Sequence, residues 1–196
     1  SGVLSRLVRF LVCTNPLSSK IYGALQKGSR SQKKVLPFIE KFGVNASEFL
    51  SAPESFSSFN DFFIRKLKPS ARPIQGEVVL PCDGRVLAFQ ELRLDTDVWV
   101  KGQPFDLSEL LGGDESLISR FQGGSMLIAR LAPVDYHRFH FPLDCTPGVV
   151  TLQNGPLYSV SPVALKRNML YLTENKRAIT LLKTAKRGEV AYIEVG

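Results

Sequence analysis

Apolar residues in the first third of the chain recur every three or four positions, the spacing of an amphipathic helix. Within residues 31–42, for example, the apolar positions face away from Lys33, Lys34 and Lys41. Further on, Ser58-Phe-Asn-Asp61 has the spacing of a capping box, which opens a short helix. The pattern predicts helices over residues 3–11, 19–26, 31–42 and 59–64.

The pattern changes near residue 70. Lys66–Pro73 contains two prolines, which exclude a regular helix, so we expect an extended basic linker and place a domain boundary there. Apolar residues then flank Asp83-Gly84, which predicts a hairpin because Asp-Gly favours tight two-residue turns. Asp106–Leu111 is predicted to be a short helix that ends at Gly112-Gly113. Further strands are predicted over residues 98–101, 125–132, 148–152, 169–173, 178–184 and 190–195.

These elements predict an α+β protein, in which N-terminal amphipathic helices accompany a mainly antiparallel β domain. The expected division is a helical region over residues 1–70 and a β-rich domain over residues 71–196. No repeat of fixed period and no low-complexity segment interrupts either part.

The positive charge is concentrated at the N-terminus. The net charge of the 196 residues is +7, and residues 1–50 hold eight Lys and Arg against two Glu, a balance of +6. Basic amphipathic helices can lie in a membrane interface, but a solvated face on a helix packed against its own core has the same pattern. Nucleic-acid binding is not indicated, since no RNP-type aromatic set is present. No apolar run reaches the roughly 18–20 residues that span a bilayer.

Three separate cysteines, Cys13, Cys82 and Cys145, indicate neither a disulfide framework nor a zinc site, and we expect a reducing compartment and no bound metal. Cys82 lies beside Asp83 and could act as a nucleophile if a histidine met it, although a buried, inert thiol is the alternative. No Gly-x-Ser-x-Gly elbow and no phosphate-loop motif is present.

Both histidines of the chain lie within Leu131–Pro142. Histidine is the side chain best suited to move protons near neutral pH, so His137 and His140 are the leading candidates for such a role. The prolines and aromatic residues around them favour an extended or irregular segment, which would direct the two rings to opposite sides and into different environments. A purely structural role in packing or at the surface remains open.

Asp83 is the carboxylate that we would pair with a histidine. The turn geometry of Asp-Gly alone can explain its presence, and Asp135 is a rival partner that lies nearer in sequence. These residues indicate a possible acid–base constellation, but they do not specify a reaction.

Seven segments, taken in order along the chain, closely resemble the phosphatidylserine decarboxylases. Several ordered matches are far more specific than any one of them. The segments are Phe59–Leu67, Ala71–Ile74, Pro81–Arg85, Lys101–Phe105, Leu131–Pro142, Gly155–Val160 and Asn175–Arg177.

The resemblance implies a proenzyme that cuts itself at a Gly-Ser bond into a larger β chain and a small α chain bearing a pyruvoyl group. It identifies Asp83 and His140 as members of the self-processing triad, with the serine outside this chain, and His137 as the histidine that acts during decarboxylation. An Asp that orients an imidazole lets the imidazole activate a serine hydroxyl. The pyruvoyl group would act as the electron sink when CO₂ leaves, as PLP does in other enzymes. The resemblance also points to Tyr136, Tyr158 and Ser159 as substrate-binding residues.

The resemblance also favours a membrane role for residues 1–70, because the family's substrate is a bilayer lipid, and leaves residues 71–196 as the catalytic domain. Arg6, Arg9, Lys33 and Lys34 would then contact anionic lipid. The implied location is peripheral, on a bacterial inner membrane or an organellar membrane. The implied partners are a pyruvoyl-bearing α chain from the same proenzyme, a phospholipid membrane and a second αβ unit in a homodimer, with no nucleic acid.

The chain ends at Gly196 without a family-type Gly-Ser motif, so we expect a β chain that lacks its C-terminal part and is inactive without the α chain. Two other functions stay open. One is a decarboxylase of this family that acts on a soluble amino acid, and the other is a non-catalytic membrane-binding module of the same fold.

Overall fold

The computed structural model describes residues 16–91, 98–100, 103–105, 107–158, 160, 165, 168 and 170–196. It divides into two compact units. The helical unit consists of Leu17–Val86 and Ala129–Asp144, and the sheet unit of Leu87–Ile128 and Cys145–Gly196, together with the residues before Leu17. The expected boundary near residue 70 therefore lies inside the helical unit. The chain passes from one unit to the other inside β1 (Arg85–Phe89) and again inside β4 (Met126–Arg130). The segment that holds the histidines therefore belongs to the helical unit.

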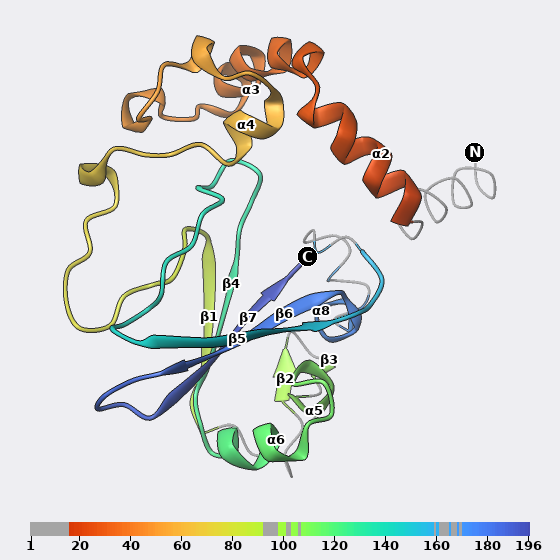
Figure 1. Cartoon of the computed structure of the whole chain (residues 1–196), viewed down its shortest axis with the longest axis vertical. Coiled ribbons are helices and arrows are strands. Elements are labelled where there is room, and N and C mark those ends of the chain that lie inside the picture. The colour runs from red at the N-terminus through yellow and green to blue at the C-terminus, as the bar shows by residue number, and fades with distance from the viewer. Residues whose placement is uncertain are drawn as a thin grey trace. The chain divides into compact units, whose positions relative to one another are not determined.

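The helical unit contains the helices expected from the periodicity of residues 19–26 and 59–64 (Figure 1). Residues 31–42 form two elements, a 3₁₀ helix followed by an α-helix that ends at Gly43 in a left-handed conformation, φ +61°. The helix predicted over residues 3–11 lies outside the described residues. The elements are α2 (Pro16–Lys27), η1 (Ser29–Lys34), α3 (Val35–Phe42), η2 (Ala46–Glu48), η3 (Pro53–Ser55), α4 (Phe59–Phe63) and η4 (Pro69–Ala71).

The helix α4 begins as the capping pattern predicts. The side chain of Ser58 accepts a hydrogen bond from the backbone N–H of Asp61 at 3.1 Å, which satisfies one of the free donors of the first turn. The helix places Phe62 at the centre of an aromatic core, with Phe49 and Phe56 packed against it at ring distances of 6.0 and 5.8 Å. Such edge-to-face and tilted contacts stabilise the packing beyond the area that they bury.

The segment predicted as an extended basic linker, Lys66–Pro73, is bound to the core of the helical unit. Leu67 forms a β-bridge with Phe49, and the N–H of Lys68 donates to the carbonyl of Glu48 at 2.8 Å. Its prolines do exclude an α-helix, but the 3₁₀ turn η4 and these backbone bonds hold the segment in place. Local propensity indicated the absence of an α-helix but not these contacts with the core.

The predicted hairpin at Asp83-Gly84 does not form. Residues 78–84 adopt no strand, and β1 (Arg85–Phe89) pairs with β4 (Met126–Arg130) instead. Gly84 has φ +126°, and a Cβ at this position would lie 2.5 Å from the carbonyl oxygen of Arg130. The glycine is therefore needed for a close approach between distant segments and not for a two-residue turn.

The sheet unit contains antiparallel strand pairs, as expected of a mainly antiparallel β domain, so the α+β fold class is confirmed (Figure 1). Its main sheet has the order β5-β6-β7, with a register irregularity in β5 between Pro147 and Val150. Leu110 and Leu165 form its buried core, against which Phe89 and Ile193 pack. The remaining elements are β2 (Val98–Val100), β3 (Gln103–Phe105), α5 (Leu107–Leu110), α6 (Glu115–Phe121), β5 (Thr146–Gln153), α8 (Tyr171–Glu174), β6 (Arg177–Lys183) and β7 (Glu189–Val195).

Two local predictions in the sheet unit differ from the structure. Residues 169–173 were expected to be a strand, but Tyr171–Glu174 is a helical turn in which the hydroxyl of Thr173 donates to a side-chain oxygen of Glu109 at 2.7 Å. Tertiary contacts outweigh β-propensity there. The helix α6 was not predicted, although Asp114 caps it by accepting from the N–H of Leu117 at 3.1 Å.

No helix among the described residues is long and apolar enough to cross a membrane.

Candidate active site

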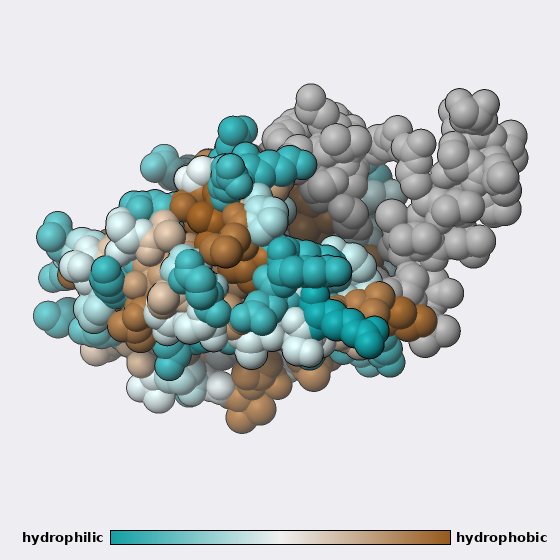
Figure 2. All heavy atoms as spheres, turned by 90° about the horizontal axis from the view of Figure 1, so that it is seen from above, coloured by the Kyte–Doolittle hydropathy of each residue, from teal (hydrophilic) through white to brown (hydrophobic). Residues whose placement is uncertain are grey.

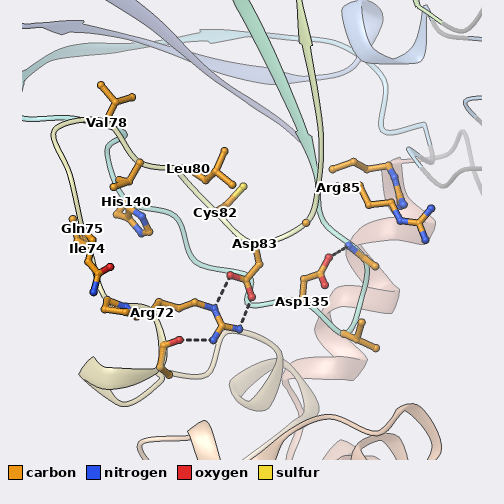
Figure 3. A pocket seen from close by; sticks show the side chains of 17 residues that line it. Arg72, Ile74, Gln75, Val78, Leu80, Cys82, Asp83, Arg85, Asp135 and His140 are labelled. Atoms are coloured by element: carbon orange, nitrogen blue, oxygen red, sulfur yellow. Dashed lines mark hydrogen bonds and ion pairs between the residues drawn. The ribbon is translucent and has the colours of Figure 1, made fainter.

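A cavity of about 850 Å³ lies within the helical unit, between the segment that precedes β1 and the segment that follows β4 (Figure 3). It brings together Asp83 and His140, which the sequence suggested as partners. Charged side chains line one part of the wall and apolar side chains another. The lining residues are Ala71, Arg72, Pro73, Ile74, Gln75, Val78, Val79, Leu80, Cys82, Asp83, Gly84, Arg85, Arg130, Ala132, Val134, Asp135 and His140.

Arg72 holds the carboxylate of Asp83 from two directions. Its Nε donates to Oδ1 at 2.8 Å and its Nη2 donates to Oδ2 at 2.7 Å, a bidentate arrangement visible in Figure 3. Its Nη1 also donates to Glu48 at 3.0 Å. The hydrogen bonds from Arg72 lower the pKa of Asp83, and the backbone N–H of Tyr136 lowers it further. Asp83 is therefore a fixed, ionised carboxylate near neutral pH.

His140 is half-buried in the cavity wall, and its backbone N–H donates to the carbonyl of Pro81 at 2.9 Å. This bond holds the histidine segment against the residues that precede Asp83. Among the described residues, no hydrogen bond joins the imidazole of His140 to the carboxylate of Asp83, whose two oxygens both accept from Arg72. Each carboxylate oxygen has a second lone pair, so Asp83 can still accept from another donor.

His137 occupies a different environment, as the extended segment predicts. Its ring stacks on Phe63 with a centroid distance of 3.9 Å, and its Nε2 lies 2.9 Å from the carbonyl oxygen of Ala132. Because a carbonyl can only accept, Nε2 carries the proton and Nδ1 is the free base of the neutral ring. Burial lowers the pKa of His137, which outweighs the opposing effect of the Ala132 carbonyl. His137 is not among the described residues that line the cavity.

Asp135 acts within its own loop. Its carboxylate accepts from the backbone N–H of Ala132 at 2.5 Å, which closes the turn between the two residues. Arg65 holds the same loop from outside, because its Nη2 donates to the carbonyls of Val134 and Asp135 at 2.9 and 3.3 Å. The guanidinium of Arg65 is buried over the rings of Phe49 and Phe62, at 5.1 and 5.0 Å. The aromatic core of the helical unit therefore positions the histidine segment.

Cys82 lies in the cavity wall and is half-buried. Burial raises the pKa of its thiol, and the carboxylates of Asp83 and Asp135 raise it further. The neutral thiol is a poor nucleophile, so this environment disfavours covalent catalysis by Cys82. Among the described residues, no group of three or more His, Cys, Asp or Glu side chains could hold a metal ion.

The other predicted site residues are spread over the chain. Tyr136 contributes its backbone N–H to Asp83, whereas Tyr158 belongs to the sheet unit, where its ring packs against Tyr171 at 4.6 Å. Lys33 is exposed, and Lys34 donates to the side chain of Gln26 at 3.0 Å. Arg6, Arg9 and Ser159 lie outside the described residues.

Three residues with direct roles in this geometry were not singled out from the sequence. Arg72 and Arg65 were counted only as basic residues, and Phe63 only as an apolar position of a short helix. Arg72 directly precedes Pro73, and Arg65 follows Phe63 by two positions; this nearness to proline and aromatic residues is the one signal that could have indicated burial.

The chain matches a known protein family over most of its length. The family model described as phosphatidylserine decarboxylase matches residues 59–196, which include α4 and every residue that lines the cavity. The chain belongs to the phosphatidylserine decarboxylase family. The resemblance inferred from the ordered motifs is therefore confirmed.

Curated relatives of this family match nearly the whole chain. The phosphatidylserine decarboxylase proenzymes of Chlamydia pneumoniae, Chlamydia muridarum and Chlamydia felis are 44%, 47% and 45% identical to it, each over 98% of this chain. The chain spans 65% of the length of each of these relatives.

Proposed function

We propose that the protein containing this chain is a self-processing decarboxylase that converts phosphatidylserine to phosphatidylethanolamine in phospholipid biosynthesis. This chain would supply its β-chain residues and would be active only together with the α chain. The observation that carries the proposal is the cavity wall shared by Asp83 and His140, in a chain of this family. The relatives are named phosphatidylserine decarboxylase proenzymes, which supports both the substrate and the processing.

In self-processing, we assign the role of general base to His140. Its imidazole has no hydrogen-bond partner among the described residues and faces a cavity, so it is available to take the proton of a serine hydroxyl from outside this chain. Asp83, kept ionised by Arg72, would orient the imidazole and stabilise the imidazolium that forms.

The cofactor that we propose is a pyruvoyl group carried by the α chain. A cavity of about 850 Å³ with charged and apolar walls has room for a small carbonyl group together with part of a lipid headgroup. When bound there, the group supplies an electrophilic carbonyl that accepts the electron pair left by departing CO₂. The residues that would surround it are His140, Asp83 and the apolar side chains of the opposite wall.

During turnover, we assign to His137 the transfer of a proton to the carbon that has lost CO₂. His137 does not line the cavity, so this assignment rests on the family resemblance and not on the geometry. Burial lowers the pKa of His137, so its protonated form gives up the proton more readily than an ordinary imidazolium. A positioned acid of this kind typically contributes about 10²–10⁴-fold to the rate. Tyr136, Tyr158 and Ser159 remain our candidates for substrate binding.

The test uses the full-length protein. Intact-mass analysis should find two chains, the smaller with a blocked, carbonyl-bearing N-terminus, and phosphatidylserine should lose CO₂. His137→Ala should still self-cleave but release no CO₂, whereas His140→Ala should remain uncut. An uncut His137→Ala protein would refute its assignment. Turnover of free serine but not of the lipid would favour a soluble amino-acid decarboxylase, and an uncut, inactive wild type would favour a non-catalytic module.

We further propose that the helical unit binds anionic membranes peripherally. The helix α2 exposes Ile21, Tyr22 and Leu25 by 54%, 65% and 65%, and Lys33 and Lys34 lie on the neighbouring η1. Figure 2 shows apolar residues exposed among polar ones on the face of the helices that is seen from above. Each basic residue near an anionic surface contributes about 1 kcal/mol, and Arg6 and Arg9 would add to this attraction.

Vesicle sedimentation tests the membrane proposal. Wild-type protein should bind vesicles that contain phosphatidylglycerol more tightly than pure phosphatidylcholine vesicles, and the preference should decline as NaCl is added. Lys33→Gln with Lys34→Gln should weaken this binding, whereas the matched control Lys183→Gln with Lys186→Gln in the sheet unit should not. Equal binding to both kinds of vesicle would remove the electrostatic contribution. We also propose a homodimer of αβ units, which sedimentation equilibrium of the processed protein would detect as twice the mass of one unit.

A further inference from the structure

Two arginines in the cavity wall have no acidic partner among the described residues. Arg85 is the first residue of β1 and Arg130 is the last residue of β4, and both line the cavity. Neither makes an ion pair within the part of the chain that the structure describes, whereas Arg72 binds both Asp83 and Glu48. In the view of Figure 3, Arg85 lies on the opposite side of Asp83 from Arg72.

The backbone places these two arginines next to each other. A Cβ on Gly84 would lie 2.5 Å from the carbonyl oxygen of Arg130, so the chain in front of Arg85 touches the end of β4. Two guanidinium groups that start from adjacent backbone positions repel each other, and an anion bound between them would relieve this repulsion more fully than solvent does. The fold therefore places two positive charges close together at the cavity.

The charge of the wall is positive overall. Three arginines and two aspartates line it, and both aspartates are already engaged. Asp83 accepts from Arg72, and Asp135 accepts from the backbone of Ala132. The formal charges of the wall sum to 3 − 2 = +1, and Arg85 and Arg130 are the two cations in it that form no ion pair among the described residues.

An apolar surface accompanies this charge. Ile74, Val78 and Leu80 line the same cavity and are 65%, 56% and 54% exposed, which is unusual for large apolar side chains grouped within seven residues. In Figure 3 they lie across Asp83 from Arg85. A ligand that contacts both parts of the wall must combine an anion with an apolar portion. Guanidinium groups are well matched to phosphate oxygens, which they bind through paired N–H donors.

We propose that Arg85 and Arg130 bind the phosphodiester of the lipid substrate, while Ile74, Val78 and Leu80 contact its glycerol and the first carbons of its acyl chains. The inference rests on the proposed function, because it assigns the substrate's phosphate to the cavity that holds Asp83 and His140. It implies that the cavity selects a phospholipid headgroup over free serine by its phosphate.

The test compares phosphate-containing and phosphate-free ligands on the processed, full-length protein. Arg85→Gln with Arg130→Gln should raise the KM for phosphatidylserine in mixed micelles at least tenfold, the effect expected for losing charge-assisted contacts. The inhibition constant of glycerophosphoserine should rise equally, as should its Kd measured by calorimetry. The kcat and the inhibition constant of serine methyl ester, which has no phosphate, should each change less than twofold.

Lys66→Gln with Lys68→Gln is the matched control, because this double variant removes the same two charges from exposed positions of the helical unit outside the cavity. It should leave the KM within twofold of wild type, and an equal rise would show general attraction to the micelle and overturn the proposal. Competition by inorganic phosphate as strong as that by glycerophosphoserine would also overturn it, because the site would then serve the free ion. Wild-type protein that neither self-cleaves nor releases CO₂ would reject the proposed function itself, whereas active wild type with unchanged constants in the arginine double variant would reject only this inference.

Discussion

Replacing Arg72 with glutamine removes the two hydrogen bonds that hold Asp83 and keeps a polar but shorter and uncharged side chain. The bonds measure 2.8 and 2.7 Å, and the side chains of Arg72 and Asp83 are 37% and 22% exposed. Fully exposed ion pairs contribute about 0.2–1 kcal/mol, and hydrogen bonds to buried charged groups about 1.5–3 kcal/mol. For this partly exposed, bidentate pair we expect a coupling of about 1–2 kcal/mol.

A double-mutant cycle of Arg72→Gln and Asp83→Asn, followed by urea unfolding at pH 7, measures this coupling directly. The matched cycle of Arg72→Gln with Glu48→Gln, whose single bond is 3.0 Å long, should give about 0.5 kcal/mol. Because Arg72 lowers the pKa of Asp83, the stabilisation is complete at neutral pH and is lost only as the pH falls through that lowered pKa, below the 3.8 of an ordinary Asp. A coupling under about 0.3 kcal/mol at pH 7 would refute the reasoning.

Three further substitutions test the packing around the site. Phe63→Leu removes the ring stacked on His137 and should raise the pKa of His137 towards 6.5, which NMR titration of its ring protons measures; no change would mean that the stack contributes no desolvation. Gly84→Ala should lower the free energy of unfolding by about 2–4 kcal/mol, because its Cβ would meet backbone at 2.5 Å, whereas Gly188→Ala, which also has positive φ but nothing within 4 Å, should cost only about 1 kcal/mol. Phe62→Ala empties the centre of the aromatic core and should cost about 3–5 kcal/mol in the same denaturation assay; a cost under 1 kcal/mol would contradict its full burial.

The lowered pKa of His137 also leads us to expect that stability depends on pH. Burial disfavours its charged form in the folded protein, so its pKa is lower there than in the unfolded chain. Protonation then favours unfolding, and stability should decline as the pH falls below the unfolded value of 6.5. In His137→Gln, this part of the decline should disappear from a series of urea midpoints measured between neutral and mildly acidic pH.

Local patterns were sufficient for most of the secondary structure. The helix α4, for example, is specified by Ser58 and by the apolar residues that follow it, and all of these signals lie within six residues. The strands β6 and β7 are likewise rich in apolar and β-branched residues within their own length. In such segments the contacts that decide the structure are near in sequence.

The hairpin and the linker could not be predicted in this way. Gly84 is required by the distant carbonyl of Arg130, and Arg72 reaches back to Glu48, 24 residues earlier. The same holds for the candidate site. The different environments of His137 and His140 follow from an extended backbone, but the contribution of Arg65 depends on contacts about 70 residues away. Sequence patterns carry no information on pairings of that kind without the fold.

The anchoring of the histidine segment by Arg65 and Phe63 has a consequence for reading variant libraries. Phe49 and Phe56 are buried and touch no reactive atom. Substitutions there would weaken the packing that supports His137 and would be recorded as losses of activity. A genetic screen for activity would therefore identify many more positions than those that take part in the chemistry, and the additional positions would be those of the aromatic core.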